Sequence, residues 1–180
     1  MKYCSNCGAK ISWKIPEGED RYRFFCEQCK VIHYTNPRVV AGTIPVQDGR
    51  ILLCRRAIEP RHGKWTLPAG YLENGETVRD CATRETLEEA CATLDNLIPY
   101  SLLNISYINQ VYVMYRAQLI NDDFRPGTES LDVQLFSPES LPWQDIAFPV
   151  ISRVLQMYCR DLETGHFPFR EVDLLPAAEE

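Results

Sequence analysis

The stretch between Gly70 and Ala92 is dense in carboxylates. Its acidic side chains are Glu73, Glu76, Asp80, Glu85, Glu88 and Glu89. Thr77 and Asp80 have the spacing of a helix capping box, and neither glycine nor proline follows them before Pro99. The sequence therefore predicts a helix from Thr77 onward.

Three glutamates of this helix share one face, because Glu85, Glu88 and Glu89 stand at positions i, i+3 and i+4. Like charges this close repel one another, so a solvated helix gains nothing from the arrangement. A divalent cation would convert the repulsion into binding, since carboxylate oxygens suit Mg²⁺ or Mn²⁺. The pattern predicts a metal site.

A second group of metal-ligand residues lies near the N-terminus, in two C-x-x-C pairs. Its members are Cys4, Cys7, Cys26 and Cys29. The spacing fits tetrahedral thiolate coordination of one Zn²⁺, whereas two disulfides would need an oxidising compartment. About 35 residues bury too little surface to fold alone, so the metal would supply stabilisation. With two short strands around a turn at 16–18, residues 1–36 are predicted to form a zinc ribbon, in which His33 has a packing or surface role.

The chain totals restrict the class of protein. With 180 residues, there is room for one ordinary domain and a small appendage. No apolar run is long enough to cross a membrane and the first residues lack the apolar core of a signal peptide, so a cytoplasmic location is expected. The net charge of −6 argues against nucleic acids and membranes as partners, because both are polyanionic. A small anionic substrate stays compatible, since bound metal ions reverse the field of an acidic site.

The remaining chain alternates between apolar segments and turns, and Asp48-Gly49 is typical of a hairpin turn. Strands are expected at 39–44, 51–54, 65–70, 94–105, 107–120 and 131–136. A helix is expected at 149–162, where apolar residues recur with helical spacing. The acidic, proline-containing tail at 164–180 is expected to be partly disordered.

The loop at 55–64 is polar and basic. Its arginines Arg55, Arg56 and Arg61 are candidates for pairing with substrate phosphate oxygens, which suit the planar guanidinium. A solvated loop with no binding role accounts equally well for the composition, and both interpretations stay open.

The acidic stretch resembles a known motif. Gly70, Glu76 and the run Arg84-Glu85-Thr86-Leu87-Glu88-Glu89 have the spacing of the Nudix box. The sequence departs from the box at Thr86, where the family usually has an aliphatic residue, and at Cys91, where it usually has glycine. Both positions are structural, so the departures concern helix packing and helix-end geometry rather than chemistry.

Together with the cysteine pairs, the whole chain is similar to the zinc-ribbon branch of the Nudix hydrolases, which includes FAD and ADP-ribose pyrophosphatases. The resemblance implies an α+β fold: an α/β/α sandwich with a mixed sheet at 37–163, preceded by the ribbon at 1–36 and followed by the tail at 164–180. It also implies a homodimer and a small-molecule nucleotide as substrate.

The resemblance assigns roles within the box. It implies that Glu85 and Glu89 bind catalytic Mg²⁺ or Mn²⁺ directly, with Glu88 as third ligand or bound through water. It also implies that the carbonyl of Gly70, or of Ala69 before it, completes the shell. The i, i+4 spacing lets Arg84 orient carboxylates instead of binding substrate, with Glu76 as its anchor. Downstream, Glu129 matches a further metal ligand or general base of relatives, and Asp132 is a weaker candidate.

The resemblance favours FAD or ADP-ribose as substrate, with AMP plus FMN or ribose 5-phosphate as products. NADH is a less favoured alternative, because the Ser-Gln-Pro-Trp-Pro-Phe-Pro signature of NADH pyrophosphatases does not follow the box. Tyr107 lies sixteen residues after Cys91, as a tyrosine does in dinucleoside polyphosphate hydrolases. Aromatic residues, Phe148 among them, are candidates for stacking on a base or flavin, although packing in the core explains them too.

A different class of function also has to be considered, because some Nudix domains sense nucleotides without catalysis and zinc ribbons elsewhere bind nucleic acid. The complete acidic set argues against lost catalysis. The mixed charge of the ribbon offers no strongly basic face for nucleic acid.

Overall fold

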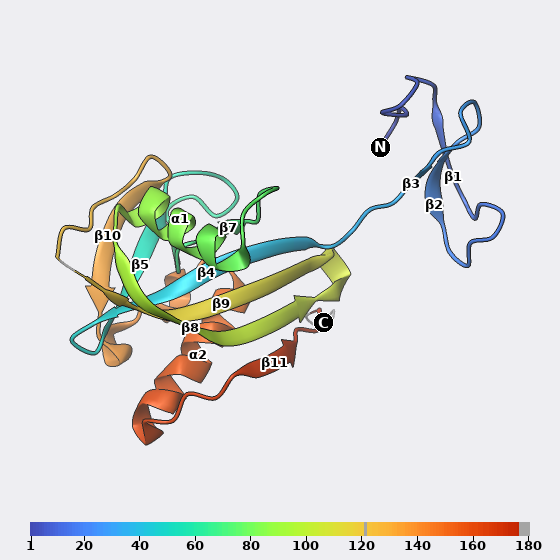
Figure 1. Ribbon diagram of the computed structural model, residues 1–180. Coiled ribbons are helices and arrows are strands. Elements are labelled where there is room, and N and C mark those ends of the chain that lie inside the picture. The colour runs from blue at the N-terminus through green and yellow to red at the C-terminus, as the bar shows by residue number, and fades with distance from the viewer. Residues whose placement is uncertain (121, 177–180) are drawn as a thin grey trace. The chain divides into compact units, whose positions relative to one another are not determined.

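The computed structural model describes residues 1–120 and 122–176 (Figure 1). The chain divides into two compact units, Met1–Pro37 and Arg38–Glu180.

The first unit is a small antiparallel sheet. Its strands are β1 (Ile11–Lys14), β2 (Arg23–Cys26) and β3 (Ile32–His33), in the order β1-β2-β3. Trp13 pairs with Phe24 across β1 and β2, and their ring centroids lie 4.6 Å apart. The two expected strands are therefore present, and a third one, β3, extends the sheet beyond the expectation.

The second unit is built on a mixed sheet. Its strands are β4 (Arg38–Gln47), β5 (Arg50–Arg56), β6 (Trp65–Thr66), β7 (Ala69–Tyr71), β8 (Leu94–Ile105), β9 (Gln110–Leu119), β10 (Ser130–Phe136) and β11 (Arg170–Asp173). They follow the order β10-β5-β4-β9-β8-β11, with β6 on β5 and β7 on β4. β4 runs parallel to β9 and β11 runs parallel to β8, whereas β8 and β9 are antiparallel.

Two helices cover this sheet, α1 (Val78–Ala90) and α2 (Pro149–Thr164), and they lie on opposite faces of it (Figure 1). Short 3₁₀ turns are η1 (Ser106–Ile108), η2 (Pro138–Ser140) and η3 (Trp143–Asp145). The predicted α/β/α sandwich with a mixed sheet is confirmed. No helix in the described part of the chain is long and apolar enough to cross a membrane.

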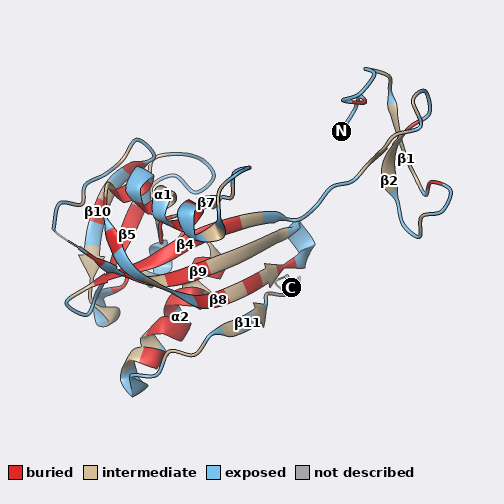
Figure 2. Ribbon diagram, viewed as in Figure 1, coloured by how far each residue is buried: buried red, intermediate tan, exposed pale blue. Residues whose placement is uncertain are grey.

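Strand β5 shows how the two layers are held together. Ile51 and Leu53 belong to the apolar cluster that contains residues of α2. Leu52 and Cys54 belong to another cluster, which contains Ala90 of α1. Successive side chains of a strand point to opposite faces, so a continuous apolar run indicates a strand covered on both sides (Figure 2).

The C-terminal segment differs from the expectation of a separate, partly disordered tail at 164–180. Residues 170–173 form β11 and pair with β8, while 177–180 lie outside the described residues. Arg170 makes two hydrogen bonds of 2.6 Å to the carboxylate of Asp161, which is 6% exposed and also accepts a 2.7 Å hydrogen bond from Tyr100. Composition could not indicate this docking, because it depends on pairing with the distant strand β8 and on an ion pair with a partner in α2.

Replacing Arg170 by methionine should therefore lower the free energy of unfolding of the second unit by about 2–3 kcal/mol, since the Asp161 carboxylate loses its cation inside the protein. Denaturant unfolding at neutral pH measures the change. Arg160→Met is the matched control, because Arg160 is exposed and lies in α2, the helix that carries Asp161. Equal stability of the two variants would contradict the importance of the pair.

Candidate active site

Helix α1, which carries the three clustered glutamates, is fixed at its N-terminus by Thr77. The hydroxyl of Thr77 accepts from the backbone N–H of Asp80 at 3.1 Å, and the Asp80 carboxylate accepts from the backbone N–H of Thr77 at 3.2 Å. The predicted capping box is thus confirmed.

The C-terminal end of α1 is held by the loop before β10. The backbone N–H of Arg125 donates to the carbonyl of Ala90 at 2.8 Å, and that of Gly127 donates to the carbonyl of Glu89 at 3.0 Å. A Cβ at position 127 would lie 1.7 Å from the carbonyl oxygen of Glu88, so only glycine permits this approach. The loop that carries Glu129 is therefore attached directly to the acidic helix.

Gly70 in β7 lies against the same helix. A Cβ at this position would come within 2.2 Å of the carboxylate carbon of Glu85. One residue earlier, the backbone N–H of Ala69 donates to the carboxylate of Glu89 at 3.4 Å. The lack of a side chain at position 70 thus leaves space for Glu85, and the backbone of 69–70 lies beside two of the predicted metal ligands.

Arg84 is the centre of an ion-pair network on this face. Its Nε and Nη2 atoms donate to both carboxylate oxygens of Glu76, at 3.0 and 2.7 Å. Its Nη1 atom lies 2.7 Å from Glu85 Oε1 and 3.1 Å from Glu88 Oε2, and Nη2 also donates to the carbonyl of Tyr71 at 3.2 Å. The expected anchoring of Arg84 by Glu76 is present, and the guanidinium lies between two carboxylates that it can orient.

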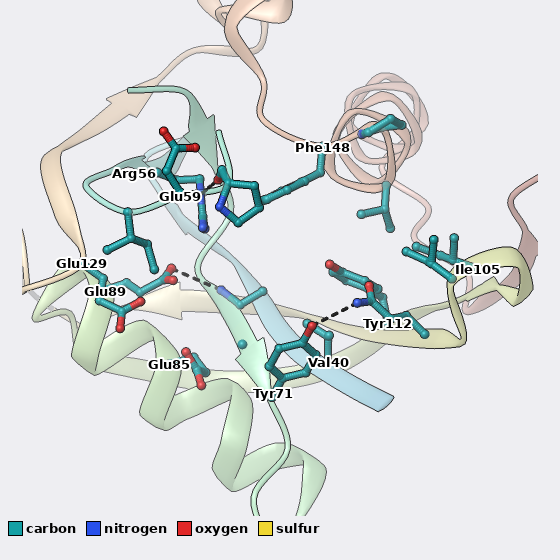
Figure 3. A pocket seen from close by; sticks show the side chains of 18 of the residues that line it. Val40, Arg56, Glu59, Tyr71, Glu85, Glu89, Ile105, Tyr112, Glu129 and Phe148 are labelled. Carbon is teal, nitrogen blue, oxygen red and sulfur yellow. Dashed lines mark hydrogen bonds between the residues drawn. The ribbon is translucent and has the colours of Figure 1, made fainter. Parts of the chain in front are cut away.

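The acidic face opens into a cavity of about 620 Å³. Its carboxylates are Glu59, Glu73, Glu85, Glu88, Glu89 and Glu129, and one guanidinium, that of Arg56, lies with them. Its wall includes Tyr71, Ile105, Tyr107, Ile108, Tyr112 and Phe148. Figure 3 shows Glu85 and Glu89 of α1 on one side and Tyr112, Ile105 and Phe148 on another. The cavity therefore combines oxygen ligands with an apolar and aromatic wall.

The cysteines form a separate cluster in the first unit. The Sγ atoms of Cys4, Cys7, Cys26 and Cys29 all lie within 4.8 Å of one another. Two of the S···S distances are 3.6 and 3.5 Å, close to the edge of about 3.8 Å expected for tetrahedral Zn²⁺ with Zn–S bonds of about 2.3 Å. The four thiols are free rather than paired as disulfides. His33 contacts this cluster, with Nε2 3.3 Å from the sulfur of Cys4.

Family comparison agrees with both clusters. The model described as NUDIX domain matches residues 36–155, and the model described as Nudix N-terminal, a zinc ribbon, matches residues 2–35. The chain belongs to the Nudix family. Nudix hydrolases act on pyrophosphate bonds, which agrees with the predicted class of enzyme.

A crystal structure of a Nudix hydrolase from Nitrosomonas europaea is 46% identical, with a TM-score of 0.93 over 97% of this chain and 99% of that one. An ADP-ribose pyrophosphatase from Streptococcus suis shares the fold, with 20% identity and a TM-score of 0.60 over 77% of this chain and all of that one.

Among curated proteins, the NAD-capped RNA hydrolase NudC of Vibrio parahaemolyticus is 27% identical over 79% of this chain and 53% of its own length. The NudC protein of Chromobacterium violaceum is 26% identical over 90% of this chain and 61% of its own length. The chain spans somewhat more than half the length of these curated relatives.

The two departures from the Nudix box have local explanations. Thr86 is fully buried, and its hydroxyl donates to the carbonyl of Ala82 at 2.8 Å and lies 2.7 Å from the hydroxyl of Thr43. A polar side chain is thus satisfied at a position that is usually aliphatic. Cys91 itself adopts the left-handed conformation usually given to glycine, with φ 49°, at a cost of about 1 kcal/mol.

Within the Nudix domain, the predicted site residues fall into three groups. Those that line the cavity are Gly70, Glu85, Glu88, Glu89, Glu129, Arg56, Tyr107 and Phe148. Arg84 and Glu76 do not line it: Arg84 donates hydrogen bonds to Glu85 and Glu88, and Glu76 accepts hydrogen bonds from Arg84. Arg55 and Arg61 do not line the cavity: Arg55 donates to the carbonyl of Gly63 at 2.9 Å, and Arg61 lines a second cavity.

One contact was not anticipated from the sequence. Gln110 in β9 donates to the hydroxyl of Tyr71 at 3.0 Å, and Arg38 donates to the same hydroxyl at 3.3 Å. These residues meet because Arg38 pairs with Gln110 in the parallel β4–β9 ladder. Only the strand pairing reveals this group, and no motif in the sequence signals it.

The pKa values of Glu76, Glu85 and Glu89 are shifted in opposite directions. Burial raises the pKa of Glu89, which is 7% exposed, to about 8, and the neighbouring charge of Glu85 adds to the effect. Burial also raises the pKa of Glu85, despite the hydrogen bond from Arg84. The hydrogen bonds from Arg84 lower the pKa of Glu76 to about 2. Ionised Glu76 thus holds the arginine, while a nearby cation would favour the ionised form of Glu89 at neutral pH.

Without added divalent cation, the Nudix domain should lose stability as the pH rises from about 5 to about 8. The unfolded chain releases the Glu89 proton near pH 4.5, whereas the folded domain keeps it up to about pH 8, so the unfolded state is favoured progressively in this interval. Denaturant unfolding between pH 5 and 9 measures the slope. Glu89→Gln should flatten it, and Glu163→Gln, at an exposed position, should not. The same slope in both variants would show that another group titrates.

Proposed function

We propose that this chain is a Mg²⁺- or Mn²⁺-dependent pyrophosphatase that hydrolyses the diphosphate bond of ADP linked to a second moiety. The observation that carries the proposal is the convergence of Glu85, Glu88, Glu89 and Glu129 in a cavity with an aromatic wall. The oxygens of Glu85, Glu88 and Glu89, with the carbonyls at 69–70, are the hard ligands that Mg²⁺ prefers, and Glu129 lines the same cavity.

The bound cation would neutralise phosphate charge and favour ionisation of a water molecule. Side chains of the protein would position the metal ligands, accept the proton of the water molecule and bind the phosphate oxygens. Arg84 holds Glu85 and Glu88 in position, and the exposed carboxylate of Glu129 is the proposed general base. The backbone carbonyl of Glu129 accepts from Ala57 at 2.8 Å, which fixes the residue at the mouth of the cavity. Arg56 is the proposed contact to the phosphate oxygens.

The substrates FAD and ADP-ribose remain our first candidates, and they would give AMP plus FMN or ribose 5-phosphate. The names of the curated relatives refer to NAD, so NADH stays the principal alternative even without the heptapeptide signature. All three contain ADP, and Tyr107, Tyr112 and Phe148 supply aromatic surface for the rings at either end. A hydrolysis screen over FAD, ADP-ribose, NADH, diadenosine polyphosphates and coenzyme A, with products identified by mass, decides among them.

Glu85→Gln and Glu89→Gln should each lower Mg²⁺-dependent kcat by about 10³-fold or more, because each variant removes a charged metal ligand. Circular dichroism should show an unchanged fold. Glu139→Gln, outside the cavity, is the control. Near wild-type rates in either box variant would refute the metal assignment.

The competing function is a nucleotide sensor without catalysis. It predicts tight nucleotide binding and no phosphate release from any member of the screen. The complete carboxylate set favours hydrolysis over this alternative. A homodimer, which the family resemblance implies, is also part of the proposal, and light scattering tests it against the monomer mass of 20.8 kDa.

We also propose that the cysteine cluster holds a structural Zn²⁺. Purified protein should contain about one zinc ion per chain, bound by four thiolates. Removal of zinc by a chelator should unfold residues 1–37 and change the fluorescence of Trp13, while the Nudix domain keeps its own core. Elemental analysis and fluorescence measure the two effects. Retention of the ribbon signal in zinc-free protein would contradict the role.

A further inference from the structure

A second cavity lies beside the proposed active site and has the opposite charge. It measures about 550 Å³ and is lined by three cationic side chains, Arg61, Lys64 and Arg153, without a carboxylate among its lining residues. It shares Pro149 and Leu174 with the acidic cavity, so the two adjoin at the N-terminal end of α2.

Two of its cations are available to a ligand. Lys64 is neutralised by Asp145, with Nζ 2.6 Å from Oδ1. Arg61 and Arg153, by contrast, form no ion pair with any carboxylate in the described ranges 1–120 and 122–176. Arg61 is exposed and Arg153 is half-buried. The cavity therefore presents two guanidinium groups whose charge is not compensated by a carboxylate of the described residues.

The uncharged polar residues of this cavity add hydrogen-bonding groups. They are Gln144, Ser152 and Gln156. Guanidinium, amide and hydroxyl donors together suit the oxygens of a phosphate group, which guanidinium binds with two parallel hydrogen bonds. The acidic cavity, in contrast, repels a phosphate unless a metal ion compensates its glutamates.

We infer that this basic cavity is a subsite for a phosphate that the substrate carries beyond its scissile diphosphate. The inference rests on the proposed function for the position of the diphosphate. With that group at the metal site, the adjoining cavity would receive an additional phosphate on the same ligand, either a phosphomonoester on a ribose or the first phosphodiester of an attached nucleotide chain. The subsite selects among substrates and takes no part in bond cleavage.

The test compares substrates that differ by one phosphate: NADH with NADPH, dephospho-coenzyme A with coenzyme A, and NAD with NAD joined through its 3′ oxygen to a dinucleotide. Wild-type protein should show a kcat/KM about tenfold or more higher for the phosphorylated member of at least one pair. The responding pair identifies the 2′ monoester, the 3′ monoester or the phosphodiester as the recognised group.

Arg61→Gln and Arg153→Gln should each reduce this preference by about tenfold and leave kcat/KM for the unphosphorylated member within about twofold. Arg50→Gln is the matched control, because it removes the same charge from the β4–β5 hairpin and lines neither cavity. An equal loss for both members of a pair, or no preference in the wild-type protein, would overturn the subsite.

A binding measurement separates this outcome from failure of the proposed function. In Ca²⁺, calorimetry should give a lower Kd for adenosine 2′,5′-bisphosphate, adenosine 3′,5′-bisphosphate or the dinucleotide pApA than for AMP. Arg153→Gln should remove the difference and reduce its salt dependence. Equal affinities for AMP and all three ligands would refute the subsite whether or not any substrate is hydrolysed.

Discussion

Repulsion among the carboxylates of α1 is the constraint on which the site depends. Glu85, Glu88 and Glu89 stand on one helical face, and the buried Glu89 has a pKa near 8. Arg84 compensates part of this charge, and Glu76 holds the arginine in place. The remaining charge favours a cation at the face. Burying the carboxylate of Glu89 costs stability, and this cost falls at the proposed metal site.

The surrounding elements keep this charged face in a fixed position. The capping box orients one end of α1, and the loop at 125–127 binds the carbonyls at the other end. Gly70 and Gly127 are required because a backbone and a carboxylate, or two backbones, approach closely. The acidic cavity is followed by a basic one around the N-terminal end of α2. A substrate with separated phosphates would therefore meet two different modes of neutralisation, by metal ion and by guanidinium.

The sequence was sufficient for features that depend on local spacing. The capping box of Thr77, the turn at Asp48-Gly49 and the contact of Arg84 with Glu88 follow from residues at most a few positions apart. Features that depend on the pairing of strands far apart in the chain could not be predicted from the sequence. The group formed by Arg38, Tyr71 and Gln110 requires the parallel β4–β9 pairing, and the docking of 170–173 combines pairing with β8 and an ion pair with Asp161 of α2. The basic composition of its loop made Arg61 a candidate for binding substrate phosphate at the acidic site, whereas in the structure Arg61 lines a neighbouring cavity.

The hydroxyl pair between Thr86 of α1 and Thr43 of β4 restricts the order in which these two residues can be exchanged. Thr86 keeps the carbonyl of Ala82 as acceptor when Thr43 is lost, but the buried hydroxyl of Thr43 has only Thr86 as a described partner. Exchanging Thr86 first for the usual aliphatic residue would leave a buried hydroxyl without a partner, at a cost of about 1–3 kcal/mol. Exchanging Thr43 first avoids that state. The two positions are therefore epistatic, and the order of substitution determines whether a lineage passes through a stable intermediate.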